Sequence, residues 1–165
     1  MKPRVSIICL AVTTFFLLIF ISTYAVAQEI KRASEIESKL VPITGDYNTR
    51  TVDLDIQFDL NSDKLSNKSK NQLVELGHAL ISEKLSNAKF KINGHTDSSG
   101  VAASNKVLSL RRAMAVKNFL IEYHGINTTR VSVNGYGEER LKNTLAPKSA
   151  DNRRVEILAI YELIV

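Results

Sequence analysis

The chain has 165 residues but a single cysteine, Cys9, which lies inside the most apolar stretch of the sequence. If that stretch is removed, no thiol remains. Disulfide bridges, thiol chemistry and cysteine-ligated metal sites are then excluded from the rest of the chain. The remaining residues must be held together by their hydrophobic core alone, and they are numerous enough for that.

The sequence also lacks a strong excess of either charge. Its formal net charge is +5, and loss of Lys2 and Arg4 lowers this by two, to +3, because no acidic residue precedes Glu29. The pairs Arg111-Arg112 and Arg153-Arg154 are basic enough to suggest nucleic acid, but no aromatic residues are interleaved with them. We therefore expect no nucleic-acid partner.

The one long apolar run predicts a secretory signal peptide over residues 1–27. Lys2 and Arg4 precede an almost wholly apolar run, residues 5–21, and residues 25–27 (Ala-Val-Ala) have the small side chains that signal peptidase requires. The mature chain would begin at Gln28. The run also approaches the ~20 residues needed to span a bilayer, so an uncleaved membrane anchor is the alternative, and we expect membrane contact only in that case.

Apolar periodicity divides the rest of the chain into a lead-in and one domain. Residues 28–50 form a polar lead-in with one short helix around residues 33–40, and the domain is expected over residues 51–165. The predicted strands are residues 51–58, 89–93, 131–135 and 154–160, and the predicted helices are residues 66–85 and 101–124. This βαβαββ order predicts an α+β fold, a two-layer sandwich with two helices packed on a mixed four-stranded sheet.

Several residues fix details of these elements. Ser66 or Asn67 can cap the first helix of the domain, and Gly125 suits a left-handed cap at the end of the second. The last strand has apolar residues on both faces, which is typical of a central strand.

The run Gly94-His95-Thr96-Asp97-Ser98-Ser99-Gly100 is the most informative motif. It leaves a half-buried strand and enters a helix, so backbone N–H groups are free at the helix start. Asp97 lies at the mouth of this turn. Asn105, Ser109 and Arg112 are spaced four and three apart, which places them on one side of the helix. A carboxylate and a guanidinium around one helix start indicate a binding site, not a catalytic one.

Four separated motifs now identify a resemblance. They are, in order, Phe58-Asp59-Leu60-Asn61-Ser62; Gly94-His95-Thr96-Asp97 with Gly100, Asn105, Leu108-Ser109 and Arg112-Ala113; Gly135-Tyr136-Gly137-Glu138; and Asn152-Arg153-Arg154-Val155-Glu156. Over roughly residues 50 to 160 the chain resembles the OmpA-like peptidoglycan-binding domain, which occurs in outer-membrane barrels, peptidoglycan-associated lipoproteins and flagellar stator proteins. In that family a proline usually follows shortly after the glutamate of the third motif, whereas Glu139-Arg140-Leu141 follows here.

The resemblance implies a ligand and a set of site residues. Asp97 and Arg112 would bind the ammonium and the carboxylate of diaminopimelate in the peptidoglycan stem peptide, whereas the structural alternative is a salt bridge between the two. Asn105, Leu108 and Arg154 would line the pocket, and backbone N–H groups from Thr96 onward would contribute. Strand neighbours face opposite ways, so only one of Arg153 and Arg154 faces the pocket, and we favour Arg154. We expect Glu138 to pair with an arginine.

The sequence offers little for catalysis or metal binding. His78 and His124 lie in separate helices without ligand spacing to His95, so we expect no metal site and no cofactor. A serine nucleophile at Ser98 or Ser99 would need an oriented base and an oxyanion hole, which the sequence does not specify. We therefore expect no enzymatic activity.

Together these features predict a periplasmic module that binds the peptidoglycan stem peptide non-covalently and without catalysis. It would tether a cell-envelope component to the wall, with peptidoglycan and an envelope protein as partners. The alternative is an envelope structural or adaptor subunit that keeps the fold and no longer binds the wall.

Overall fold

The computed structural model describes residues 30–42, 49–58 and 62–161. The segment predicted as a signal peptide and residues 59–61 of the first motif lie outside the described residues.

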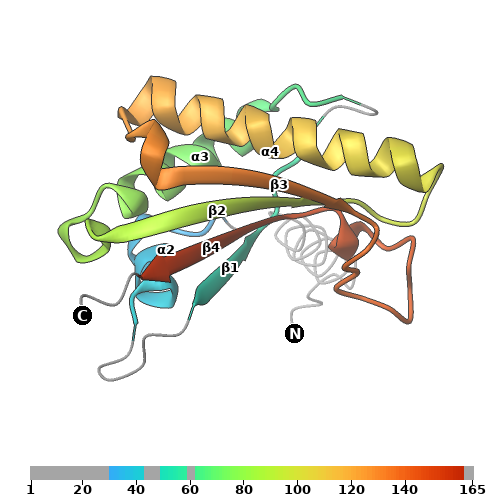
Figure 1. Cartoon of the computed structure of the whole chain (residues 1–165), viewed down its shortest axis with the longest axis horizontal. Coiled ribbons are helices and arrows are strands. Elements are labelled where there is room, and N and C mark those ends of the chain that lie inside the picture. The colour runs from blue at the N-terminus through green and yellow to red at the C-terminus, as the bar shows by residue number, and fades with distance from the viewer. Residues whose placement is uncertain (1–29, 43–48, 59–61, 162–165) are drawn as a thin grey trace, which may run out of the picture. The chain divides into compact units, whose positions relative to one another are not determined.

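The described residues form three α-helices, four strands and three short 3-10 turns, so the predicted α+β architecture is confirmed (Figure 1). The helices are α2 (Ala33–Leu40), α3 (Asn67–Leu80) and α4 (Ala102–His124). The strands are β1 (Arg50–Leu54), β2 (Ala88–His95), β3 (Val131–Gly137) and β4 (Val155–Tyr161). The 3-10 turns are η1 (Glu83–Leu85), η2 (Thr128–Arg130) and η3 (Ala150–Asn152).

The four strands form one mixed sheet in the order β1-β4-β2-β3. Strand β4 pairs antiparallel with both β1 and β2, and this confirms the central position predicted for it. Strands β2 and β3 are parallel, and the helix α4 connects them across the sheet. The carboxyl ends of β2 and β3 therefore lie side by side, at the same end as the start of α4 (Figure 1).

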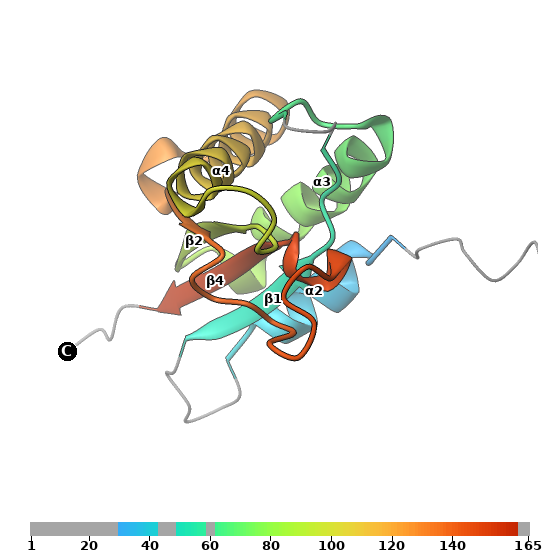
Figure 2. The same cartoon turned by 90° about the vertical axis from the view of Figure 1, so that its right-hand side faces the viewer.

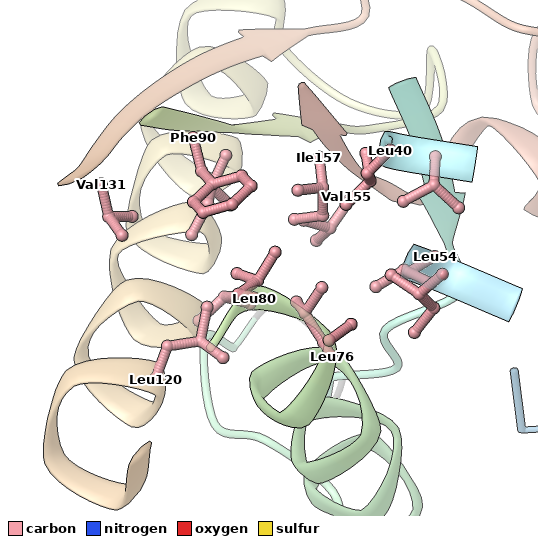
Figure 3. Close-up of a cluster of buried hydrophobic side chains, with 14 of the residues drawn as sticks. Leu40, Leu54, Leu76, Leu80, Phe90, Leu120, Val131, Val155 and Ile157 are labelled. Carbon is pink, nitrogen blue, oxygen red and sulfur yellow. The ribbon is translucent and has the colours of Figure 1, made fainter. Parts of the chain in front are cut away.

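Helices α3 and α4 cover one face of the sheet (Figure 2). From β2, Phe90 and Ile92 are buried under them, and in the register of β2 with β4 they lie opposite Ala159 and Ile157, which are also buried. Helix α3 contributes a stripe of leucines at helical spacing. These leucines are Leu73, Leu76 and Leu80, all fully buried. Figure 3 shows the two sets of side chains interdigitating in the core.

The lead-in helix α2 belongs to this core. Ile36 and Leu40 are both fully buried, and Leu40 points toward Leu54 and Val155 (Figure 3). The Tyr161 hydroxyl of β4 donates a hydrogen bond to the Leu40 carbonyl over 2.8 Å. Three helices therefore pack on the sheet instead of the two predicted. Only two apolar side chains face inward from an eight-residue helix, and so short a pattern does not distinguish a packed helix from a solvated one.

Two predicted boundaries are wrong. Alternation predicted a first strand reaching Phe58, but the pairing of β1 with β4 ends at Leu54, and Phe58 makes only an isolated bridge with Leu65. Alternation continues because Ile56 is still buried, and burial does not require strand pairing. The helix expected to reach residue 85 ends at Leu80 and is followed by η1.

Glycines let α4 approach the sheet closely. A Cβ atom on Gly94 would overlap the Ser109 carbonyl, and a Cβ on Gly135 would overlap the backbone of Leu110. The fully buried Ser109 hydroxyl accepts a hydrogen bond from the Gly137 N–H over 2.8 Å and donates one to the Lys106 carbonyl over 2.9 Å. This contact fixes the first half of α4 over the ends of β2 and β3.

Candidate ligand-binding site

The turn between β2 and α4 is held by the two segments that flank it. The Thr96 N–H donates to the Gly137 carbonyl over 2.9 Å, which extends the pairing of β2 with β3 by one residue. The Ser98 N–H donates to the Pro147 carbonyl over 3.0 Å. Gly100 has a φ of +91°, a backbone conformation that other residues rarely adopt. The turn is therefore fixed at both ends before it enters the helix.

Asp97 lies in this turn with a largely buried side chain. One carboxylate oxygen, Oδ1, accepts the Ser99 N–H over 2.9 Å, and the other, Oδ2, accepts Nη1 of Arg153 over 2.7 Å. Burial alone would raise the pKa of Asp97, but the hydrogen bonds from Arg153 and Ser99 outweigh it and lower the pKa below the usual aspartate value. The carboxylate is thus held in its charged form.

The structure reverses the predicted choice between the two arginines. Arg153 contacts Asp97, whereas the Arg154 guanidinium is directed to β1, where Nε donates to Asp53 over 3.1 Å, and also reaches the Arg140 carbonyl at 3.3 Å. The prediction assumed strand alternation through both residues. Arg153 instead follows η3 directly and lies before the first residue of β4, so alternation does not decide where its side chain points.

Arg112 flanks Asp97 without bonding to it. Its Nε donates to the Ser62 carbonyl over 3.1 Å, and its guanidinium carbon lies 4.9 Å from the centre of the Phe58 ring. Burial and the charge of Arg153 lower the pKa of Arg112, while the charge of Asp97 acts in the opposite direction. Arg153 bonds Asp97, and the charges of both residues act on Arg112. The first motif of the sequence thus meets the second through Arg112.

Asn105 ties the turn to the end of β3. Its side-chain NH₂ group contacts the Ser99 carbonyl at 3.0 Å and the Glu138 carboxylate at 2.6 Å, and it lies 3.3 Å from the Asp97 carbonyl. Glu138 therefore accepts a hydrogen bond from an asparagine, where an arginine partner was predicted. Asn105 reaches the Asp97 turn from α4, as predicted, but its donor hydrogens are used within the protein.

The two remaining predicted site residues lie next to these groups. Thr96 is 4 % exposed, and its hydroxyl has no hydrogen-bond partner among the described residues. Leu108 lies one turn before Arg112 on α4, is half-buried, and does not belong to the main hydrophobic core. An apolar side chain in that position can form the wall of a pocket.

Sequence reasoning missed the role of the loop between β3 and β4. Asn152 is fully buried and its side chain bonds to four backbone groups of this loop. Its Nδ2 donates to the carbonyls of Asn143, Ala146 and Pro147, and its Oδ1 accepts the Asn143 N–H. Pro147 then contacts Ser98, so Asn152 positions the loop against the Asp97 turn. Asn152 is the first residue of the fourth motif, whereas the sequence prediction used only the two arginines of that motif.

His95 faces the other side of the sheet from the core. It is 2 % exposed, stacks on Tyr136 with ring centres 5.5 Å apart, and its Nε2 lies 3.9 Å from Glu156. Interaction with His95 and the hydrogen bond from Asn93 lower the pKa of Glu156 to about 2, against the opposing effect of its burial. These residues support the strand end that carries Asp97.

The structure also brings together two histidines from separate helices. His78 of α3 and His124 of α4 meet edge to face with ring centres 5.2 Å apart. Among the described residues, no group of three or more histidine, cysteine or acidic side chains is arranged to hold a metal ion. Within the same part of the chain, no helix combines the length and the apolar character that crossing a bilayer requires.

Comparison with known proteins agrees with this geometry. The family model described as "OmpA family" matches residues 57–155, a range that contains Asp97, Arg112 and Arg153. The chain belongs to the OmpA family.

Two relatives illustrate the breadth of this family. The chain is 37 % identical over 107 residues to outer membrane porin F of Pseudomonas aeruginosa, which covers 64 % of this chain and 30 % of the porin. It is 33 % identical over 85 residues to the peptidoglycan-associated lipoprotein of Buchnera aphidicola, covering 52 % of this chain and 47 % of the lipoprotein. The OmpA-family chain thus spans less than half the length of these two relatives.

Among solved structures, the fold is similar to that of the cell wall anchor of the type VI secretion system of Pseudomonas aeruginosa. The TM-score is 0.58 at 23 % identity, over 79 % of this chain and 94 % of the anchor. At this identity the similarity establishes the shared fold.

Proposed function

We propose that this OmpA-family protein binds the stem peptide of peptidoglycan non-covalently and tethers a cell-envelope component to the wall. The diaminopimelate residue of that peptide presents an ammonium and a carboxylate on one carbon. Asp97 is complementary to the ammonium, and the forked guanidinium of Arg112 is complementary to the carboxylate. The observation that carries the proposal is a carboxylate kept ionised between two arginines at the end of β2.

The neighbouring residues have supporting roles in this proposal. Asn105 holds the turn that presents Asp97, and Leu108 forms an apolar wall next to Arg112. The N–H groups of Thr96, Ser98 and Ser99 are bonded within the protein and the Thr96 hydroxyl is buried, so these groups hold the turn that presents Asp97. Arg154 has no direct role in ligand binding, because its guanidinium is held by Asp53 and the Arg140 carbonyl.

The proposed role is non-catalytic and places the protein in the periplasm, with a mature chain that begins at Gln28. The names of its relatives, an outer membrane porin and a peptidoglycan-associated lipoprotein, support a position at the wall or the outer membrane. The envelope component that is tethered would be a protein partner of this domain.

Sedimentation with purified peptidoglycan tests the proposal. Asp97→Ala and Arg112→Ala should each lower binding about 30-fold or more, because removal of one partner from a buried charged contact costs about 2–5 kcal/mol. Matched controls are Asp55→Ala and Arg111→Ala, which remove exposed charges; Arg111 lies next to Arg112 on α4 but is 53 % exposed. Free diaminopimelate should compete with the wall for the parent protein.

Circular dichroism of each variant separates loss of binding from loss of fold. If folded Asp97→Ala and Arg112→Ala proteins still sediment like the parent, the proposed site is wrong. If the parent itself does not sediment with peptidoglycan, the adaptor alternative is favoured.

A further inference from the structure

Asp97 is already paired with a cation of its own protein. Arg153 Nη1 lies 2.7 Å from the carboxylate, on the oxygen that Ser99 does not bond. The Asp97 side chain is 11 % exposed and the Arg153 side chain 49 % exposed. Arg153 therefore occupies a position at the Asp97 carboxylate that a ligand ammonium would need.

We propose that Arg153 is a displaceable cation that makes the site specific for a ligand end carrying both an ammonium and a carboxylate. The ligand ammonium replaces the Arg153 guanidinium on Asp97, and the released guanidinium binds the ligand carboxylate together with Arg112. This inference rests on the proposed function and names the residue that sets the specificity of that site.

The two arginines differ in their freedom to move. The Arg112 guanidinium is half-buried, stacked on Phe58 and bonded to the Ser62 carbonyl, so it is fixed in place. The backbone of Arg153 is anchored, since its N–H donates to the Ala150 carbonyl over 2.9 Å, whereas its side chain is 49 % exposed and bonds to Asp97. An ion pair with one exposed partner is weak, because water competes with it. The side chain of Arg153 can change partner without movement of the loop.

Charge balance gives the specificity. Arg153 bonds the Asp97 carboxylate, and its charge lowers the pKa of the neighbouring Arg112, which indicates repulsion between the two guanidinium groups. A ligand with an amine alone would add a third cation beside these two. A ligand with an α-amino acid end brings its own carboxylate and gives the released Arg153 a new partner. Displacement is therefore favourable only for the second kind of ligand.

Two soluble stem peptides test this, one with diaminopimelate and one with lysine at the same position, because lysine lacks the terminal carboxylate. Calorimetry should show that the parent protein prefers the diaminopimelate peptide. Arg153→Ala should weaken binding of the diaminopimelate peptide about tenfold. Binding of the lysine peptide should stay unchanged or become tighter, because the Arg153 guanidinium no longer occupies Asp97. Arg153→Lys should recover part of the preference. The control is Arg32→Ala, an exposed arginine at the start of α2, which should bind both peptides like the parent.

The possible failures are distinguishable. If Arg153→Ala weakens both peptides equally, or changes neither, the displacement proposal is wrong while the proposed function stands. If the parent binds neither the peptides nor peptidoglycan, the proposed function and this inference fail together.

Discussion

Asp97 illustrates how a single side chain obtains its properties from several distant segments. Its carboxylate is bonded by the turn residue Ser99 and by Arg153, which lies 56 positions later in the chain. The Arg112 guanidinium lies over the Phe58 ring, and its Nε donates to the carbonyl of Ser62, which lies 50 positions earlier. No local segment could hold a carboxylate and two guanidinium groups at this spacing, so the site exists only in the folded chain.

The lowered pKa of Asp97 predicts the pH dependence of binding. A carboxylate with a lowered pKa stays charged as pH falls through the ordinary aspartate range, about 3.9, and loses its charge only below it. Binding to peptidoglycan should therefore persist at pH 4 and fall at lower pH. Sedimentation across a pH series measures this, with circular dichroism at each pH to verify the fold. A midpoint above the ordinary aspartate value would contradict the proposed pairing.

At the scale of elements, α4 connects the site to the opposite end of the domain. Its first half packs on the glycines of β2 and β3 and presents Asn105 and Arg112. Its last residue, His124, packs on Gly77 of α3 and on the ring of His78. Gly125 then ends the helix in the left-handed conformation, with φ +65°, as the sequence predicted.

The contact between α3 and α4 should weaken on acidification. Burial, and then the charge of His78, lower the pKa of His124, so the folded state disfavours the protonated ring. The unfolded chain then binds more protons just below the ordinary histidine value of about 6.5, and stability falls as pH drops through that range. In urea unfolding, the parent should lose more stability between pH 7.5 and pH 5 than His124→Phe, which keeps a ring on Gly77.

The parent and His124→Phe have the same carboxylates, so the contribution of carboxylate titration to the pH dependence of stability cancels when the two proteins are compared. His78→Gln serves as the second variant, because it removes the neighbouring charge and should reduce the pH dependence in part. Equal pH dependence in the parent and His124→Phe would show that His124 does not carry this effect.

At the scale of the whole molecule, the described part of the lead-in from Lys31 onward and the domain form one folded unit. The helix α2 adds Ile36 and Leu40 to the core, and Gln72 of α3 exchanges two hydrogen bonds with the backbone of Lys31, at 2.8 and 2.9 Å. A domain boundary at residue 51 would cut through this core.

Truncation of Leu40 tests whether the lead-in stabilises the domain. Leu40→Ala should cost about 2–5 kcal/mol of unfolding free energy, because it removes a fully buried side chain and leaves a cavity. The neighbouring Lys39→Ala breaks only an exposed ion pair with Glu35 at 3.3 Å, and it should lower the unfolding free energy by about 0.2–0.5 kcal/mol. Chemical denaturation measures both. Equal, small effects would mean that α2 is dispensable to the fold.

The sequence by itself determined the order of the elements and the strand-to-helix turn after β2 that carries Asp97. Alternation identified β2 as a half-buried strand, apolar residues on both faces identified β4 as a central strand, and Ser66 and Gly125 marked two helix ends. These features depend on neighbours within a few residues, where backbone geometry fixes which side chains share a face.

Only the tertiary structure decided which side chains meet across the fold. It paired Asp97 with Arg153 instead of Arg112 or Arg154, because a 3-10 turn interrupts alternation before β4. It also buried α2 and brought His78 against His124. Such contacts join segments tens of residues apart, and their partners are set by the packing of the sheet and helices, which local spacing does not encode.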